Sequence, residues 1–144
     1  MTPLNRYNQK LADGSLRPDP VQQKAVGLLE KLHHDIVKAA AKGPKNWFKF
    51  GKSKKDFIKG VYFHGGVGRG KTMLMDMFFE TIPDTIPKRR VHFHEFMIEV
   101  HAYINARRED GELETVDATL PTLAERIAER AQLLCFDEFH VTDI

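Results

Sequence analysis

Residues 65–72 combine glycines, a lysine and a threonine at a spacing that suits the binding of a phosphate chain. They read Gly65-Gly66-Val67-Gly68-Arg69-Gly70-Lys71-Thr72, which fits the P-loop pattern of glycine, four free positions, glycine, lysine, and serine or threonine. Glycines let the backbone direct successive N–H groups at phosphate oxygens, and a helix that begins there adds the positive end of its dipole. The pattern predicts that Lys71 reaches the β- and γ-phosphates and that the Thr72 hydroxyl ligates Mg²⁺.

The sequence on both sides of this motif supports a P-loop over its alternative, a flexible glycine-rich linker. Apolar, β-prone residues at 57–58 and 61–64 predict a strand that ends at the first glycine. After the motif, apolar residues recur at helical spacing until Pro83 stops the pattern. Strand, glycine-rich loop and helix form the context that a P-loop requires.

A second motif lies where another apolar strand ends. Residues 133–136 are apolar throughout, and Asp137 and Glu138 follow them, which is the Walker B pattern. At the carboxyl end of a strand, Asp137 can hold Mg²⁺ through its water shell, opposite Thr72. Glu138 is then placed to polarise a water for attack on the γ-phosphate. Together, the two motifs predict Mg²⁺-dependent binding and hydrolysis of ATP, with Lys71 and Glu138 as the catalytic residues.

Helices and strands alternate along the chain, so we expect an α/β fold, a P-loop NTPase with a parallel sheet flanked by helices. Residues 1–18 are expected to be irregular, residues 1–55 to form an N-terminal helical region with a lysine-rich loop, and residues 56–144 to form the partial ATPase core. The expected elements are a helix opened by Asp19 and ended by Gly43-Pro44, the strand and helix around the P-loop, a strand at 90–94, a helix at 95–108, a loop at 109–121, a helix at 122–131 and a strand at 133–136.

Composition excludes several classes of protein. The chain has 144 residues, 42% of them apolar, and a net charge of +2, which suits one soluble domain and argues against nucleic acid as a partner. It contains no run of 18 apolar residues, and its first residues lead us to expect neither a signal nor a transit peptide. The single cysteine, Cys135, fits a reducing cytosol and a buried core position.

Three further features leave alternatives open. Gln22 either completes a capping box with Asp19 or reads the adenine edge with its amide. The lysine-rich stretch at 42–59 is either a solvated loop or a patch for nucleic acid or an anionic membrane. His92 and His94 are expected on one face of a strand, in a structural role, at the nucleotide site or, with His101, in a metal cluster. His140 is a hypothetical sensor of what occupies the site.

Three motifs in order resemble the ZapE-type AAA+ ATPases, a family of bacterial cell-division ATPases with mitochondrial relatives. They are residues 65–76, 91–97 and 134–144, and the positions of Tyr7, Gly14, Asp19, Gln22 and Ala25 also fit. The resemblance implies ATP and Mg²⁺ as cofactors, remodelling of a protein partner of the division ring, and a homo-oligomeric ring. It also implies a cytoplasmic protein that associates peripherally with the inner membrane, and the absent transit peptide favours the bacterial branch.

The chain ends just after Walker B, before the sensor, arginine finger and helical lid that the resemblance implies. We therefore expect an N-terminal portion of a longer protein, which alone binds ATP weakly and barely hydrolyses it. Without the strands that follow in such a fold, the P-loop strand is expected to lack a neighbour for its backbone groups. The competing hypotheses are a nucleic-acid-dependent ATPase of the helicase-loader type, supported only by residues 42–59, and an inactive nucleotide-binding fragment.

Overall fold

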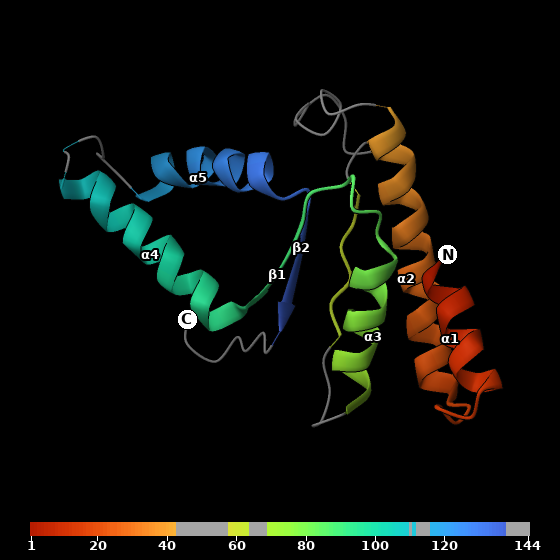
Figure 1. Ribbon diagram of the computed structural model, residues 1–144. Coiled ribbons are helices and arrows are strands. Elements are labelled where there is room, and N and C mark those ends of the chain that lie inside the picture. The colour runs from red at the N-terminus through yellow and green to blue at the C-terminus, as the bar shows by residue number, and fades with distance from the viewer. Residues whose placement is uncertain (43–57, 64–68, 110, 112–115, 138–144) are drawn as a thin grey trace. The chain divides into compact units, whose positions relative to one another are not determined.

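The computed structural model describes residues 1–42, 58–63, 69–109, 111 and 116–137 (Figure 1). Contacts divide the chain into two compact units, Met1–Thr85 and Ile86–Ile144. The domain boundary expected near residue 55 lies outside the described residues, so that division stays a prediction. Within the described part of the chain, no helix is long and apolar enough to cross a membrane.

The first unit begins with a helix, α1 (Pro3–Ala12), where an irregular segment was expected. That expectation was wrong because the start signal uses asparagine in place of glutamate or glutamine. Thr2 and Asn5 form a capping box: the Thr2 hydroxyl accepts from the Asn5 backbone, and the Asn5 side chain accepts from the Thr2 backbone. Pro3 suits the first turn, where a missing N–H costs nothing. Tyr7, fully buried, anchors the helix to the unit.

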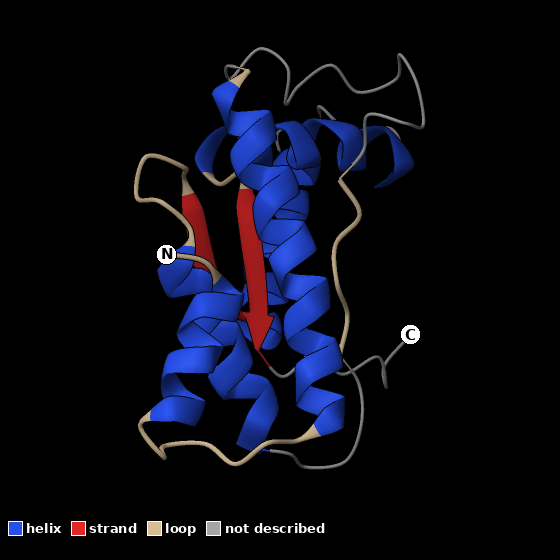
Figure 2. Ribbon diagram, turned by 90° about the vertical axis from the view of Figure 1, so that its right-hand side faces the viewer, coloured by secondary structure: helices blue, strands red, loops and turns tan. Residues whose placement is uncertain are grey.

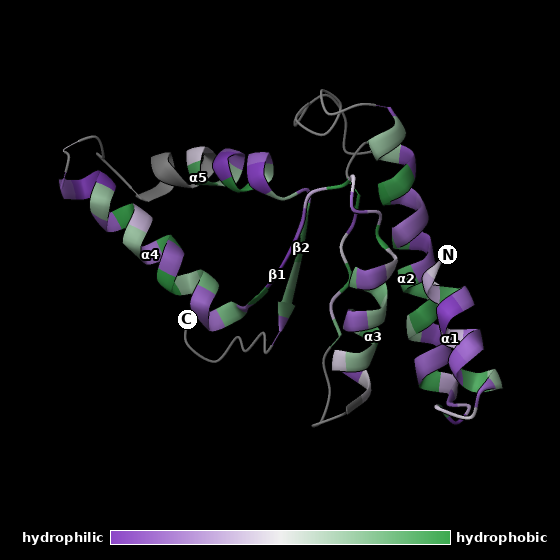
Figure 3. Ribbon diagram, viewed as in Figure 1, coloured by the Kyte–Doolittle hydropathy of each residue, from purple (hydrophilic) through white to green (hydrophobic). Residues whose placement is uncertain are grey.

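The helix expected after Asp19 is confirmed as α2 (Pro20–Ala41). The Asp19 carboxylate caps it by accepting from the backbone N–H groups of Val21 and Gln22. One side of α2 is buried, and its members recur at helical spacing: Ala25, Val26, Leu29, Leu32, His33 and Ile36. Figure 3 shows hydrophobic and hydrophilic residues alternating along α1 and α2, as in amphipathic helices.

The helix expected after the P-loop is confirmed as α3 (Arg69–Thr81). Its buried side chains Leu74, Met77 and Phe78 lie one helical turn apart, and α3 contacts both α1 and α2. At its C-terminal end the carbonyl of Thr81 accepts a hydrogen bond from Nε2 of His33, at 3.1 Å. Buried His33 therefore links the middle of α2 to the end of α3.

The strand expected before the P-loop does not form at residues 58–63, which carry no strand structure. A β-strand is stabilised by hydrogen bonds to a neighbouring strand, and the only described sheet pairs two other segments. Residues 57 and 64, at the edges of the expected strand, lie outside the described residues. The apolar run at 58–63 therefore has β propensity but no described pairing partner.

The second unit contains a parallel pair of strands, β1 (Lys88–His92) and β2 (Leu133–Asp137). They lie side by side in Figure 2. The strand expected at 90–94 thus begins and ends two residues earlier, and the strand expected at 133–136 is confirmed with Asp137 as its last residue. The register pairs Arg90 with Cys135 and His92 with Asp137, so the carboxyl ends of both strands meet at the same edge.

Two helices, α4 (Phe93–Glu109) and α5 (Val116–Arg130), lie on one side of this strand pair (Figure 1). Phe136 of β2 packs edge-to-face against Phe93 and Phe96 of α4, with ring centroids 5.7 and 4.8 Å apart. The guanidinium groups of Arg107 and Arg126 lie 5.5 and 5.3 Å from the ring centroid of Tyr103 of α4, and the Arg126 contact joins α4 to α5. Aromatic side chains therefore join β2 to α4 on this side of the strand pair.

The expected loop at 109–121 is wrong from residue 116 onward, because α5 begins at Val116 and continues through Pro121. The sequence pattern of Thr122 and Glu125 resembled a capping box and placed the start too late. A proline inside a helix removes one backbone hydrogen bond, and here α5 retains its helical course and contacts α4.

Candidate nucleotide-binding site

The first candidate segment for nucleotide binding is the N-terminal turn of α3. Gly65, Gly66, Val67 and Gly68 lie outside the described residues, and α3 begins at Arg69. Gly70 and Lys71 are half-buried in the first turn, and Thr72 is exposed. The first turn of a helix has N–H groups with no acceptor inside the helix, and these suit phosphate oxygens. The structure thus begins the helix within the P-loop motif, as the sequence predicts.

Gln22 of α2 lies against this turn. A Cβ atom added to Gly70 would stand 2.8 Å from Nε2 of Gln22, which is too short for a contact between such atoms. The N-terminal ends of α2 and α3 therefore lie next to each other at the P-loop. The Asp19 carboxylate accepts a hydrogen bond from the backbone N–H of Gln22. This confirms the hydrogen bond that Asp19 was expected to contribute to the capping box. The Gln22 side chain lies beside Gly70.

The second candidate segment, in the other unit, is the end of β2. Asp137 is the last strand residue, and Glu138 lies outside the described residues. Arg90 of β1 holds both carboxylate oxygens of Asp137: Nε donates to Oδ2 at 2.8 Å, and Nη2 donates to Oδ1 at 3.2 Å. The side chains are 27% and 15% exposed, so the pair is partly shielded from water. Sequence reasoning did not find Arg90, because its proximity to Asp137 depends on strand register.

Cys135, two residues before Asp137, is buried, and burial raises the pKa of its thiol to about 11. The positive charge of Arg90 opposes this shift only in part. A thiol with so high a pKa is protonated at neutral pH and is a poor nucleophile. The buried core position expected for this residue is therefore supported.

The expectation that His92 and His94 share one face of a strand was wrong. His92 ends β1, whereas His94 lies in the first turn of α4. Both are exposed, as is His101, and in the described segments no three His, Cys, Asp or Glu side chains gather in a way that could hold a metal ion. His140 falls outside those segments.

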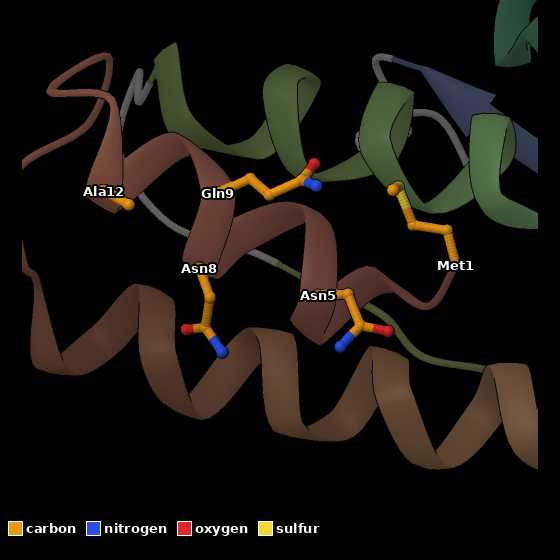
Figure 4. Close-up of a pocket in the computed structure, with 5 residues that line it drawn as sticks. All are labelled: Met1, Asn5, Asn8, Gln9 and Ala12. Carbon is orange, nitrogen blue, oxygen red and sulfur yellow. The ribbon is translucent and has the colours of Figure 1, made fainter.

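A pocket of about 550 Å³ lies along α1 (Figure 4). Its lining comes only from the N-terminal residues Met1, Asn5, Asn8, Gln9 and Ala12. None of them belongs to either Walker motif. This pocket is therefore not part of the candidate nucleotide-binding residues.

The donor atoms at the two motifs suit Mg²⁺, which prefers oxygen ligands. Thr72 offers a hydroxyl oxygen, and Asp137 offers carboxylate oxygens that keep acceptor capacity beyond their two bonds to Arg90. The residues fit the ion that the P-loop pattern implies. Thr72 belongs to the unit Met1–Thr85, and Asp137 belongs to the unit Ile86–Ile144.

Comparison with known proteins assigns the family. The sequence matches the AFG1-like ATPase family over residues 1–144. The chain belongs to this family. The ZapE-type resemblance found in the motifs is thereby confirmed at the level of the family.

Among curated members of the AFG1-like ATPase family, the cell division protein ZapE of Escherichia coli K12 is 36% identical over 154 aligned residues, which include all of this chain and 39% of ZapE. An uncharacterised protein of Schizosaccharomyces pombe is 32% identical, with 99% of this chain and 37% of that protein aligned. Lactation elevated protein 1 homolog B of Danio rerio is 44% identical over 98 residues, covering 64% of this chain and 19% of the relative.

The chain therefore spans less than half the length of the curated relatives it matches, and against ZapE it corresponds to an N-terminal portion. No solved structure matches it at a significant level.

Proposed function

We propose that the protein binds Mg²⁺ and ATP at the two Walker motifs and hydrolyses ATP. The observation that carries the proposal is the start of α3 at Arg69, inside the P-loop of a chain that matches an ATPase family along its whole length. Residues 65–72 cradle the phosphates, and Lys71 neutralises the charge that develops on the γ-phosphoryl group. Bound Mg²⁺ supplies Lewis-acid stabilisation of that charge, held by Thr72 and Asp137.

In this proposal Glu138 acts as the base that orients and polarises the attacking water. Hydrolysis breaks the bond between the γ-phosphorus and the bridging oxygen, forms a bond to the water oxygen, and releases ADP and phosphate. A carboxylate directly after the Mg²⁺-binding aspartate favours water as the nucleophile. The AAA+ type of ATPase, with nucleotide bound between subunits of a homo-oligomer, is part of the same proposal.

We further propose that turnover drives remodelling of a protein partner in cell division. Similarity to a cell division protein supports this context. The alternative of a nucleic-acid-dependent ATPase rests on the lysine-rich segment at 42–59, most of which lies outside the described residues, and it stays a prediction. Peripheral association with the inner membrane is likewise a proposal that follows from the family resemblance.

Nucleotide binding by Lys71→Ala tests the proposed phosphate site. In the full-length protein, the affinity for Mg·ATP measured by calorimetry should fall at least about tenfold, because the lysine contacts phosphate as a point charge. Lys24→Ala is the matched control, since Lys24 is an exposed lysine of α2 in the same unit. Equal affinity in both variants and the wild type would reject the P-loop assignment.

A further inference from the structure

The contact between Arg90 and Asp137 depends on the register of β1 and β2 and on the face of the strands that the two side chains share. Arg90 is paired with Cys135, one side-chain step before Asp137, and residues two apart point to the same face of a strand. Arg90 therefore reaches diagonally toward the carboxyl edge of the sheet, where Asp137 ends β2. Its planar guanidinium matches the two carboxylate oxygens of Asp137 as a fork.

A neighbouring pair shows that this arrangement is unlike an ordinary surface ion pair. Arg89, the preceding residue, is paired with Glu99 of α4, and those side chains are 41% and 53% exposed. Arg90 and Asp137 are exposed to only 27% and 15%. Screening by water is weaker in the second pair, so the orientation of the Asp137 carboxylate depends more on its arginine.

Two physical consequences follow for Asp137. The fork fixes the rotamer of a side chain that would otherwise choose among several. The guanidinium charge also offsets part of the negative potential that attracts a divalent cation. The arginine thus lowers the affinity of the Asp137 carboxylate for the cation and fixes the direction in which the carboxylate points.

We propose that Arg90 is a positioning residue that holds the Asp137 carboxylate in the orientation needed for Mg²⁺-dependent ATP hydrolysis. The positive charge of Arg90 also lowers the affinity of the Asp137 carboxylate for Mg²⁺. This role rests on the proposed function, because it assigns Asp137 to Mg²⁺. It is distinct from a role in strand pairing alone, which predicts loss of stability without tighter binding of the ion.

The test compares Arg90→Gln with Arg89→Gln in the full-length protein. Mg²⁺ is titrated calorimetrically into nucleotide-saturated protein, and ATP turnover and thermal melting are measured on the same samples. In Arg90→Gln, Mg²⁺ should bind about three- to tenfold more tightly because a nearby positive charge is gone, and kcat should fall about tenfold or more because the carboxylate loses its fixed direction. Arg89→Gln should change neither quantity by more than about twofold.

Arg90→Lys keeps the charge and loses the fork, so it separates the two effects even if Arg90→Gln folds poorly. It should leave Mg²⁺ affinity within about twofold of the wild type and still lower kcat. Unchanged or weaker Mg²⁺ binding by Arg90→Gln, a normal kcat for Arg90→Lys, or equal effects of the Arg89 and Arg90 variants would overturn the proposal. Wild-type protein that fails to bind Mg·ATP would reject the proposed function itself, and the role of Arg90 with it.

Discussion

Lys71 and Asp137 carry much of the proposed chemistry, and they differ in how far the sequence could place them. Lys71 follows a local pattern, so its position in the first turn of α3 was predictable from neighbours in the chain. The end of β2 at Asp137 was predictable for the same reason. Arg90 was not, because its contact with Asp137 joins residues 47 positions apart and depends on a parallel register that no local pattern encodes.

Glu99 provides a prediction on pH dependence at the residue scale. The hydrogen bond from Arg89 holds the pKa of Glu99 below its usual value of 4.5. A lowered folded-state pKa stabilises the fold above the unfolded value, and that contribution is lost as pH falls through the folded value. The wild type should therefore exceed Glu99→Gln in stability at pH 7, and the difference should shrink as pH falls below about 4.5.

Urea unfolding of both proteins at several pH values measures this difference, which should be small because both side chains are substantially exposed and should shrink further in high salt. A gap between the two proteins that widens toward low pH would contradict the assigned ion pair.

Helices were more predictable than strand pairing at the scale of elements. The α2 helix carries a strong start signal, and both α2 and α3 have regular apolar spacing. The α1 helix was missed because its capping box uses Asn5, and the start of α5 was misplaced because Thr122 and Glu125 resemble a capping box. Residues 58–63 have β-prone side chains, but propensity alone forms no strand without a neighbour to accept its hydrogen bonds.

The contact between Gln22 and Gly70 predicts coupling between α2 and α3. Gly70→Ala forces the end of the Gln22 side chain to move, because Nε2 stands 2.8 Å from the new Cβ. Chemical denaturation should show Gly70→Ala better tolerated in a Gln22→Ala background than in the wild type, by about 0.5–1 kcal/mol.

Gly27→Ala in the interior of α2 is the control, since a Cβ there meets nothing within 4 Å. It should stabilise the protein by about 0.5–1 kcal/mol, equally with and without Gln22. Additive effects of the Gly70 and Gln22 substitutions would show that this contact has no energetic consequence.

The whole chain separates its two Walker motifs between two compact units, with α3 in Met1–Thr85 and β2 in Ile86–Ile144. Three sequence motifs in the family's order indicated the family. The family match confirmed it across residues 1–144. The partner and the oligomeric state depend on surfaces that the motifs do not encode. Since the curated relatives are more than twice as long as this chain, the coupling of hydrolysis to remodelling is a property proposed for the full-length protein.

Phosphate release by the full-length protein, measured alongside ATP binding for Glu138→Gln, tests the central claim most directly. A glutamine keeps the size of the side chain but cannot accept the proton of the attacking water. ATP should bind within about threefold of the wild-type affinity, while turnover should fall about a hundredfold or more. Turnover that persists at the wild-type rate in Glu138→Gln, or wild-type protein that releases no phosphate with Mg·ATP, would contradict ATP hydrolysis at this site.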